Sequence, residues 1–111
     1  MMTAGTLQSL AMQPCIQGAE RLSDAALDEG LQALQGWTLI DGRIEKTFRF
    51  ADYHDTMAFV NAIAWIAHHA DHHPDLSVHF NRCVVSYSTH DAGGVTRNDL
   101  VCAARVERLL A

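Results

Sequence analysis

The apolar pattern after residue 52 constrains the fold most, because it requires a long helix that has to stop at a proline. Apolar residues recur at helical spacing from Phe59 to Ala70. Asp52 stands where a helix N-cap is expected, with its side chain free to accept a backbone N–H. Pro74 disfavours helical backbone in the residue before it, so the helix must end near residues 71–72.

A first hairpin is predicted before this helix. Residues 37–40 are short and apolar, and residues 44–50 mostly alternate between apolar and polar types, as a half-buried strand does. Between them stands Asp41-Gly42, a dipeptide typical of a tight hairpin turn. The sequence therefore predicts two antiparallel strands here.

A second hairpin is predicted after Pro74. Residues 76–80 alternate, and residues 83–89 continue as a strand. Asn81-Arg82 is taken as the two-residue turn between them, although Arg is not a favoured second turn residue. This turn would bring Leu76 close to Thr89.

Two further helices complete the pattern. Ser23 is expected to cap a helix over about residues 24–35, which Gly36 ends. Thr96 is expected to cap the last helix, with Asp99 in its first turn. The predicted buried stripe of that helix is Cys102, Ala103, Val106, Leu109 and Leu110.

The predicted order is α-β-β-α-β-β-α, an α+β fold in which a four-stranded antiparallel sheet carries three helices on one face. With 111 residues the chain has room for one domain. We assign residues 21–111 to that domain and expect residues 1–20 to form a loosely held arm. The formal net charge of −5 argues against binding to a nucleic-acid backbone.

Compartment and assembly are predicted from simple features. The cysteines are odd in number and far apart in sequence: Cys15, Cys83 and Cys102. This pattern favours neither a disulfide framework nor a cysteine zinc site. It suggests that the protein resides in a reducing cytoplasm. No apolar run is long enough for a membrane helix. Unprotected sheet edges and a second apolar strip on the long helix predict a homo-oligomer, either a dimer or a tetramer. That strip is Ala58, Ala62 and Trp65.

The end of the long helix is rich in histidine. Four of the seven histidines fall between residues 68 and 73, directly before Pro74. Pairs four residues apart, such as His68 with His72, could share a metal on a helix face, but a third protein ligand would be needed. Solvated histidines favoured by the negative end of the helix dipole are a second interpretation. The third is acid–base chemistry on a bound small molecule, because imidazole exchanges protons near neutral pH.

The predicted fold favours the third interpretation for one group of residues. His72 and His73 lie where the helix turns into a strand, and His90 lies at the end of the strand paired with it. Asp99, in the first turn of the last helix, can approach the same corner. Three imidazoles and a carboxylate around one corner suit general acid–base catalysis.

These residues and their spacing resemble the pterin-4a-carbinolamine dehydratases over roughly residues 22–110. The order of elements also matches, without gaps. Two departures are small: His68 stands where many relatives carry Glu, and Ala92 where some carry Cys, so no catalytic cysteine is expected. The matching residues are His68-x-x-x-His72-His73-Pro74, Phe80, Ser88-Thr89-His90-Asp91, Gly94 and Asp99, with Gly36-Trp37 and Phe48-Arg49-Phe50 upstream.

The resemblance implies a hydro-lyase that converts 4a-hydroxytetrahydropterin into quinonoid dihydropterin and water. It implies that His72, His73 and His90 are the catalytic, pterin-contacting imidazoles and that Asp99 supports them. It also implies pterin contacts for Trp37, Pro74, Ser88 and Thr89, and a need for no metal or cofactor.

The resemblance also implies partners. The enzyme would recycle the pterin used by an aromatic amino acid hydroxylase. The alternative is a non-enzymatic module, since some members of the family act as dimerisation cofactors of a homeodomain transcription factor. A role in molybdopterin-related metabolism, or loss of activity, is a third possibility; the intact set of His72, His73, His90 and Asp99 argues against loss of activity.

Overall fold

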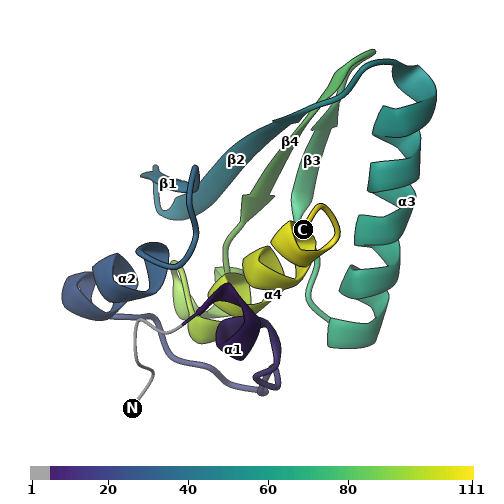
Figure 1. Cartoon of the computed structure of the whole chain (residues 1–111). Coiled ribbons are helices and arrows are strands. Elements are labelled where there is room, and N and C mark those ends of the chain that lie inside the picture. The colour runs from purple at the N-terminus through teal and green to yellow at the C-terminus, as the bar shows by residue number, and fades with distance from the viewer. Residues whose placement is uncertain (1–5) are drawn as a thin grey trace.

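The computed structural model describes residues 6–111 and contains one four-stranded antiparallel sheet. The strands are β1 (Thr38–Ile40), β2 (Arg43–Arg49), β3 (Asp75–Val78) and β4 (Arg82–Tyr87). Their order in the sheet is β1-β2-β4-β3, so the two hairpins meet where β2 pairs with β4 (Figure 1).

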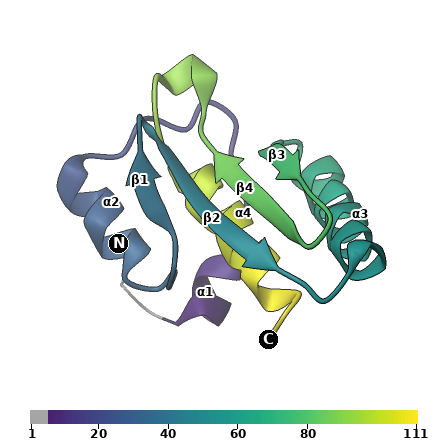
Figure 2. The same ribbon diagram turned by 90° about the horizontal axis from the view of Figure 1, so that it is seen from above.

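Within residues 6–111, four α-helices accompany the sheet. They are α1 (Leu7–Ala11), α2 (Asp24–Leu31), α3 (Tyr53–Ala70) and α4 (Arg97–Arg108), and a short 3-10 turn, η1, spans His90–Ala92. Figure 2 shows α2, α4 and α3 side by side on one side of the sheet. The predicted α+β class and the order of the three larger helices and four strands are confirmed, and α1 is an addition to them.

The local signals for helix starts and for the first turn are confirmed. Ser23, Asp52 and Thr96 are the N-caps of α2, α3 and α4, and each side chain accepts a backbone N–H of its own helix. Asp41 and Gly42 both have positive φ angles, 49° and 77°, which the tight turn between β1 and β2 requires. Helix α2 ends earlier than predicted, at Leu31, and turns lead from there to Gly36.

The second hairpin corrects the predicted turn by one residue. Leu76 pairs with Val85, and the N–H of His79 donates to the carbonyl of Arg82 at 2.9 Å. The two turn residues are therefore Phe80 and Asn81, and Leu76 does not lie opposite Thr89.

Phe80 explains why the apolar–polar alternation predicted the wrong turn residues. Its apolar side chain fits the alternation of a strand, but in the structure it is 64% exposed and stacks on Tyr53, with ring centroids 6.4 Å apart. The Thr56 hydroxyl donates to the carbonyl of Phe80 at 3.0 Å and so ties the turn to the first turns of α3.

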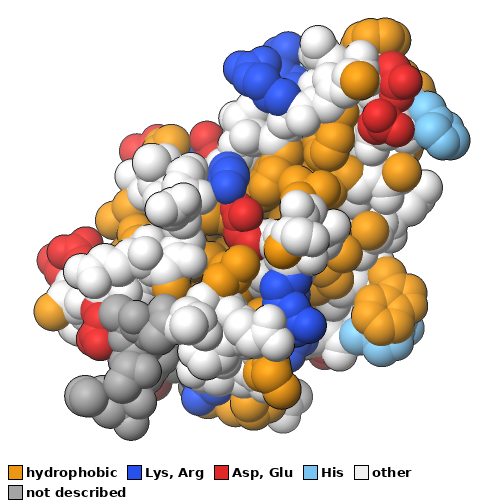
Figure 3. All heavy atoms as spheres, viewed as in Figure 1, with side chains coloured by type: hydrophobic (Ala, Val, Ile, Leu, Met, Phe, Trp, Pro, Cys, Tyr) orange, Lys and Arg blue, Asp and Glu red, His pale blue; other side chains and the backbone are white. Residues whose placement is uncertain are grey.

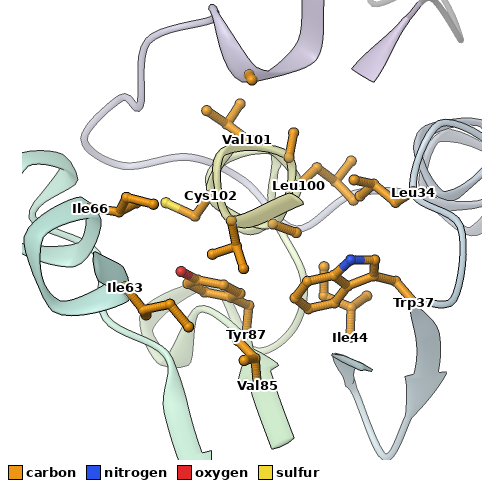
Figure 4. Close-up of a cluster of buried hydrophobic side chains, with 14 of the residues drawn as sticks. Leu34, Trp37, Ile44, Ile63, Ile66, Val85, Tyr87, Leu100, Val101 and Cys102 are labelled. Atoms are coloured by element: carbon orange, nitrogen blue, oxygen red, sulfur yellow. The ribbon is translucent and has the colours of Figure 1, made fainter. Parts of the chain in front are cut away.

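Helix α4 is the centre of the core. Figure 4 shows it surrounded by Ile63 and Ile66 of α3, by Tyr87 of β4, and by Trp37. Its middle is buried on nearly every side, through Leu100, Val101, Cys102, Ala103, Ala104 and Val106. The predicted burial of Leu109 and Leu110 is wrong, because α4 ends at Arg108 and both side chains are exposed beyond it.

The N-terminal segment covers the side of α4 that faces away from the sheet, where Val101 points in Figure 4. Leu10 and Ala11 of α1 are buried there. The Arg105 guanidinium donates to the carbonyl of Ala11 at 3.1 Å and to that of Gln13 at 2.8 Å. The structure thus corrects the expectation of a loosely held arm for residues 7–16, because the middle of α4 is apolar on nearly every side and needs this cover; residues 1–5 lie outside the described residues.

Among residues 6–111, no helix combines the length and the apolar content that crossing a membrane would need.

The packing of α1 on α4 predicts different costs for two neighbouring substitutions. Leu10 is 4% exposed and Met12 is 70% exposed. Leu10→Ala should lower the free energy of unfolding by about 2–3 kcal/mol, because it removes buried methyl groups and leaves a cavity. Met12→Ala should change it by less than about 0.5 kcal/mol. Urea unfolding followed by tryptophan fluorescence measures both, and equal small effects would show that α1 does not belong to the core.

Candidate active site

His72 turns inward directly after α3 ends. Asp71 takes a left-handed conformation, with φ of 49°, and the N–H of His72 donates back to the carbonyl of Ala67 at 3.2 Å. With Asp71 as the C-cap of α3, the His72 ring points toward the start of α4. There its Nε2 lies 2.5 Å from Oδ1 of Asp99. The His72 side chain is 13% exposed and that of Asp99 is fully buried.

The Asp99 carboxylate is held by the N-cap residue of its own helix and by Thr89, which follows β4. Its Oδ2 accepts the hydroxyl of Thr89 and the backbone N–H of Thr96, each at 2.8 Å. The second bond is half of the capping box that starts α4. A buried carboxylate needs such donors to offset the loss of water, so Asp99 is fixed before any ligand arrives.

Tyr87 lies against His72 and was not singled out by the sequence analysis. The two rings are nearly parallel, with an interplanar angle of 8° and centroids 5.9 Å apart. Burial raises the pKa of Tyr87, so the phenol stays protonated and acts as an apolar wall. The available signal was strand alternation, because residues two apart on a strand point to the same side and Tyr87 stands two positions before Thr89.

A hollow of about 310 Å³ lies beside this corner. The segment after β4 lines one side of it with Ser88, Thr89 and His90, and Asp75 joins them from the start of β3. The turn between β1 and β2 and the glycines after η1 close the rest, through Asp41, Gly42, Arg43, Gly93 and Gly94.

The predicted site residues divide into three groups. His72, Asp99 and Thr89 form one hydrogen-bonded chain, and Ser88, Thr89 and His90 share the hollow. His73 is exposed and Pro74 is half-buried, directly before the Asp75 that lines the hollow.

Trp37 lies apart from these groups. It is buried in the core, and its indole N–H donates to Glu107 of α4 at 2.9 Å. Its ring neighbours Tyr87, with centroids 6.2 Å apart, so its geometric link to His72 runs through that ring.

His68 and His69 are the two members of the histidine pairs that lie on α3, and His69 contacts Trp65. The His69 ring stacks on Trp65, with centroids 3.7 Å apart, and its Nδ1 lies 3.0 Å from the carbonyl of Trp65. Within residues 6–111, no three His, Cys, Asp or Glu side chains gather into a group that could hold a metal ion.

The arrangement suits proton transfer. His72 directs Nε2 at a buried carboxylate, which leaves Nδ1 as the ring nitrogen for a ligand. The contact with Asp99 also fixes the orientation of the ring. His90 adds a second, exposed imidazole at the hollow.

Comparisons with known proteins agree with this picture. Residues 20–109 match the family model for pterin 4 alpha carbinolamine dehydratase. A protein from Chromobacterium violaceum, provisionally named as this dehydratase, is 55% identical over 92 residues, which cover 83% of this chain and 85% of the relative. A Stenotrophomonas maltophilia protein with the same provisional name is 51% identical over 105 residues, which cover 90% of each chain.

A solved structure supports the same assignment. The crystal structure of a transcriptional coactivator/pterin dehydratase from Brucella melitensis superposes with a TM-score of 0.80 at 32% identity, over 83% of this chain and 100% of that one. With the family model covering the whole stretch from α2 to the end of α4, this chain is a member of the pterin-4a-carbinolamine dehydratase family, a family of hydro-lyases.

Proposed function

We propose that the protein dehydrates 4a-hydroxytetrahydropterin to quinonoid dihydropterin by histidine acid–base catalysis. The observation that carries the proposal is the 2.5 Å contact between His72 and the buried Asp99, beside a hollow lined by His90. Family membership supplies the substrate class. The geometry supplies groups suited to the two proton transfers that loss of water requires.

The reaction breaks the bond between C4a and its hydroxyl oxygen and removes the proton from N5. The leaving hydroxyl needs a proton to depart as water, and N5 needs a base. We assign the base to His72, because its contact with Asp99 orients the ring through Nε2 and leaves Nδ1 to take the proton. His73 and His90 then remain to protonate the hydroxyl and to contact the pterin, with Pro74, Ser88 and Thr89 lining the site. The buried position of Trp37 favours a supporting role for it, through Tyr87.

The physiological setting follows from the substrate. An aromatic amino acid hydroxylase that uses tetrahydropterin releases the 4a-hydroxy form, so we propose that such an enzyme supplies the substrate. The free thiols of the three cysteines are compatible with the cytoplasmic setting proposed for this coupling.

Replacing the site histidines should lower turnover without unfolding the protein. His72→Ala, His73→Ala and His90→Ala should each reduce kcat by about 10²–10⁴-fold, the usual contribution of a general acid or base. His54→Ala, an exposed histidine in the first turn of α3, is the matched control and should leave kcat unchanged. Stopped-flow dehydration assays measure the rates.

If chelation abolishes activity and zinc restores it, the histidine pairs at residues 68–73 form a metal site and the acid–base proposal fails.

Asp99 should act through His72 and not on the pterin. Asp99→Asn keeps the size of the side chain but removes its charge, so kcat should fall by less than in His72→Ala while KM stays nearly constant, because the fully buried Asp99 does not touch substrate. Thr89→Val removes one donor to the carboxylate and should cause a smaller loss in kcat. A rise in KM as large as the fall in kcat in Asp99→Asn would contradict this role.

The α3 face with Trp65 supports the proposal that the protein is a homodimer or homotetramer. Figure 3 shows hydrophobic side chains gathered where α3 faces the end of α4. Trp65 is 64% exposed there and, with Ala62 and Leu109, lines a groove of about 460 Å³. Trp65→Glu should therefore lower the mass measured by light scattering at micromolar concentration, and Tyr53→Glu, at an exposed site near the start of the same helix, is the control. A wild-type protein that is monomeric under these conditions would refute the proposal.

A second candidate function is protein binding in gene regulation. The observation that favours it is the likeness to the Brucella melitensis protein, which is described as a transcriptional coactivator/pterin dehydratase. The exposed α3 face would be the binding surface and the histidines would be dispensable. Binding that survives His72→Ala but is lost in Trp65→Glu would separate this function from the dehydratase.

A further inference from the structure

Two thiols that are far apart in sequence touch in the core. The Sγ atoms of Cys15 and Cys102 lie 3.9 Å apart, although 87 positions separate the residues. Both cysteines are free. A disulfide needs its sulfur atoms at about 2.0 Å, so the two side chains are in contact and not yet bonded.

Hydrogen bonds on both sides of Cys15 hold this contact in place. The N–H of Ile16 donates to Oδ1 of Asn98 at 2.9 Å, and Nδ2 of Asn98 donates back to the carbonyl of Ile16 at 2.7 Å. On the other side, the Arg97 guanidinium donates to the carbonyl of Pro14 at 3.0 Å. Cys15 is thus docked on α4 by both of its sequence neighbours, which keeps its thiol beside Cys102.

The two thiols differ in access. Cys15 is half-buried, so a small oxidant can reach it, whereas Cys102 is fully buried on α4, where Figure 4 shows its side chain pointing toward Ile66. Burial raises the pKa of the Cys102 thiol, which makes it a poor first nucleophile. Cys83 lies on β4, paired with Phe48 and Val78 in the sheet, and belongs to another part of the core.

We propose that Cys15 and Cys102 form a reversible disulfide in response to a hydroperoxide, and that this bond latches the N-terminal segment onto α4. The Cys15 sulfur attacks the terminal peroxide oxygen, the O–O bond breaks, and an alcohol or water leaves with a sulfenic acid on Cys15. The Cys102 sulfur then displaces the sulfenic hydroxyl, which leaves as water. Two thiols are oxidised by two electrons, and one peroxide is reduced.

The latch would act on the helix that carries the site. Cys102 lies three positions after Asp99 on α4, and the segment that it would bind covers the outer side of that helix. A cross-link between residues 15 and 102 restricts most of the unfolded chain, which stabilises the folded state. The proposal concerns residues outside the dehydratase chemistry, so it stands or falls independently of the proposed function.

Peptide mapping tests the latch on the full chain, because each cysteine lies in a different tryptic peptide. Cys15 lies in the peptide that ends at Arg21, Cys83 in residues 83–97, and Cys102 in residues 98–105. After treatment with hydrogen peroxide and alkylation of free thiols, we expect a cross-linked peptide joining the first and third of these, lighter than their sum by two hydrogen atoms. The Tm should rise by at least about 5 °C and return after reduction.

Matched variants make the result decisive. Cys83→Ser should keep the cross-link and the shift in Tm, whereas Cys15→Ser, at a half-buried position outside the packed centre of α4, should lose both while folding normally. Cys102→Ala, which removes the other thiol, should also lose the cross-link and the shift in Tm. A link from Cys15 to Cys83 or to a second copy, irreversible oxidation of Cys15 without a link, thiols that stay fully alkylatable, or a link without a shift in Tm would each overturn the proposal.

Discussion

The buried carboxylate of Asp99 is the constraint on which the site depends. A charge with no access to water has to be surrounded by donors, and three segments provide them: Thr96 at the start of α4, Thr89 after β4, and His72 after α3. Because the three meet at one side chain, the ends of α3 and β4 and the start of α4 cannot shift independently. The imidazole is therefore positioned by the fold itself, and catalytic geometry benefits when such support comes from rigid elements.

Helix α4 links this site to the rest of the molecule. Its sheet-facing side packs on Tyr87, which also forms the wall against His72, and its outer side is covered by α1 and the residues that follow it. The same segment brings Cys15 to Cys102. The N-terminal segment is far from the hollow in sequence. Its packing nevertheless supports α4, the helix that carries Asp99.

Features with local causes could be predicted from the sequence. The caps at Ser23, Asp52 and Thr96 and the Asp41-Gly42 turn each depend on residues within a few positions, and all are found in the structure. The approach of Asp99 to His72 also followed from the order of elements. Features with distant causes could not be predicted: α1 docks on the apolar side of α4 that faces away from the sheet and that would otherwise be exposed. The Phe80 turn likewise depends on Tyr53 and Thr56 in another element.

Imidazole resonances in ¹H–¹⁵N NMR spectra during titration with a dihydropterin test the location of the site most directly. If the pterin binds beside the His72–Asp99 pair, the ring signals of His72, His73 and His90 should shift in a saturable way. Those of His54 and His69, on the exposed part of α3, should stay in place. Shifts confined to His69 beside Trp65, or no shifts at all, would contradict the account.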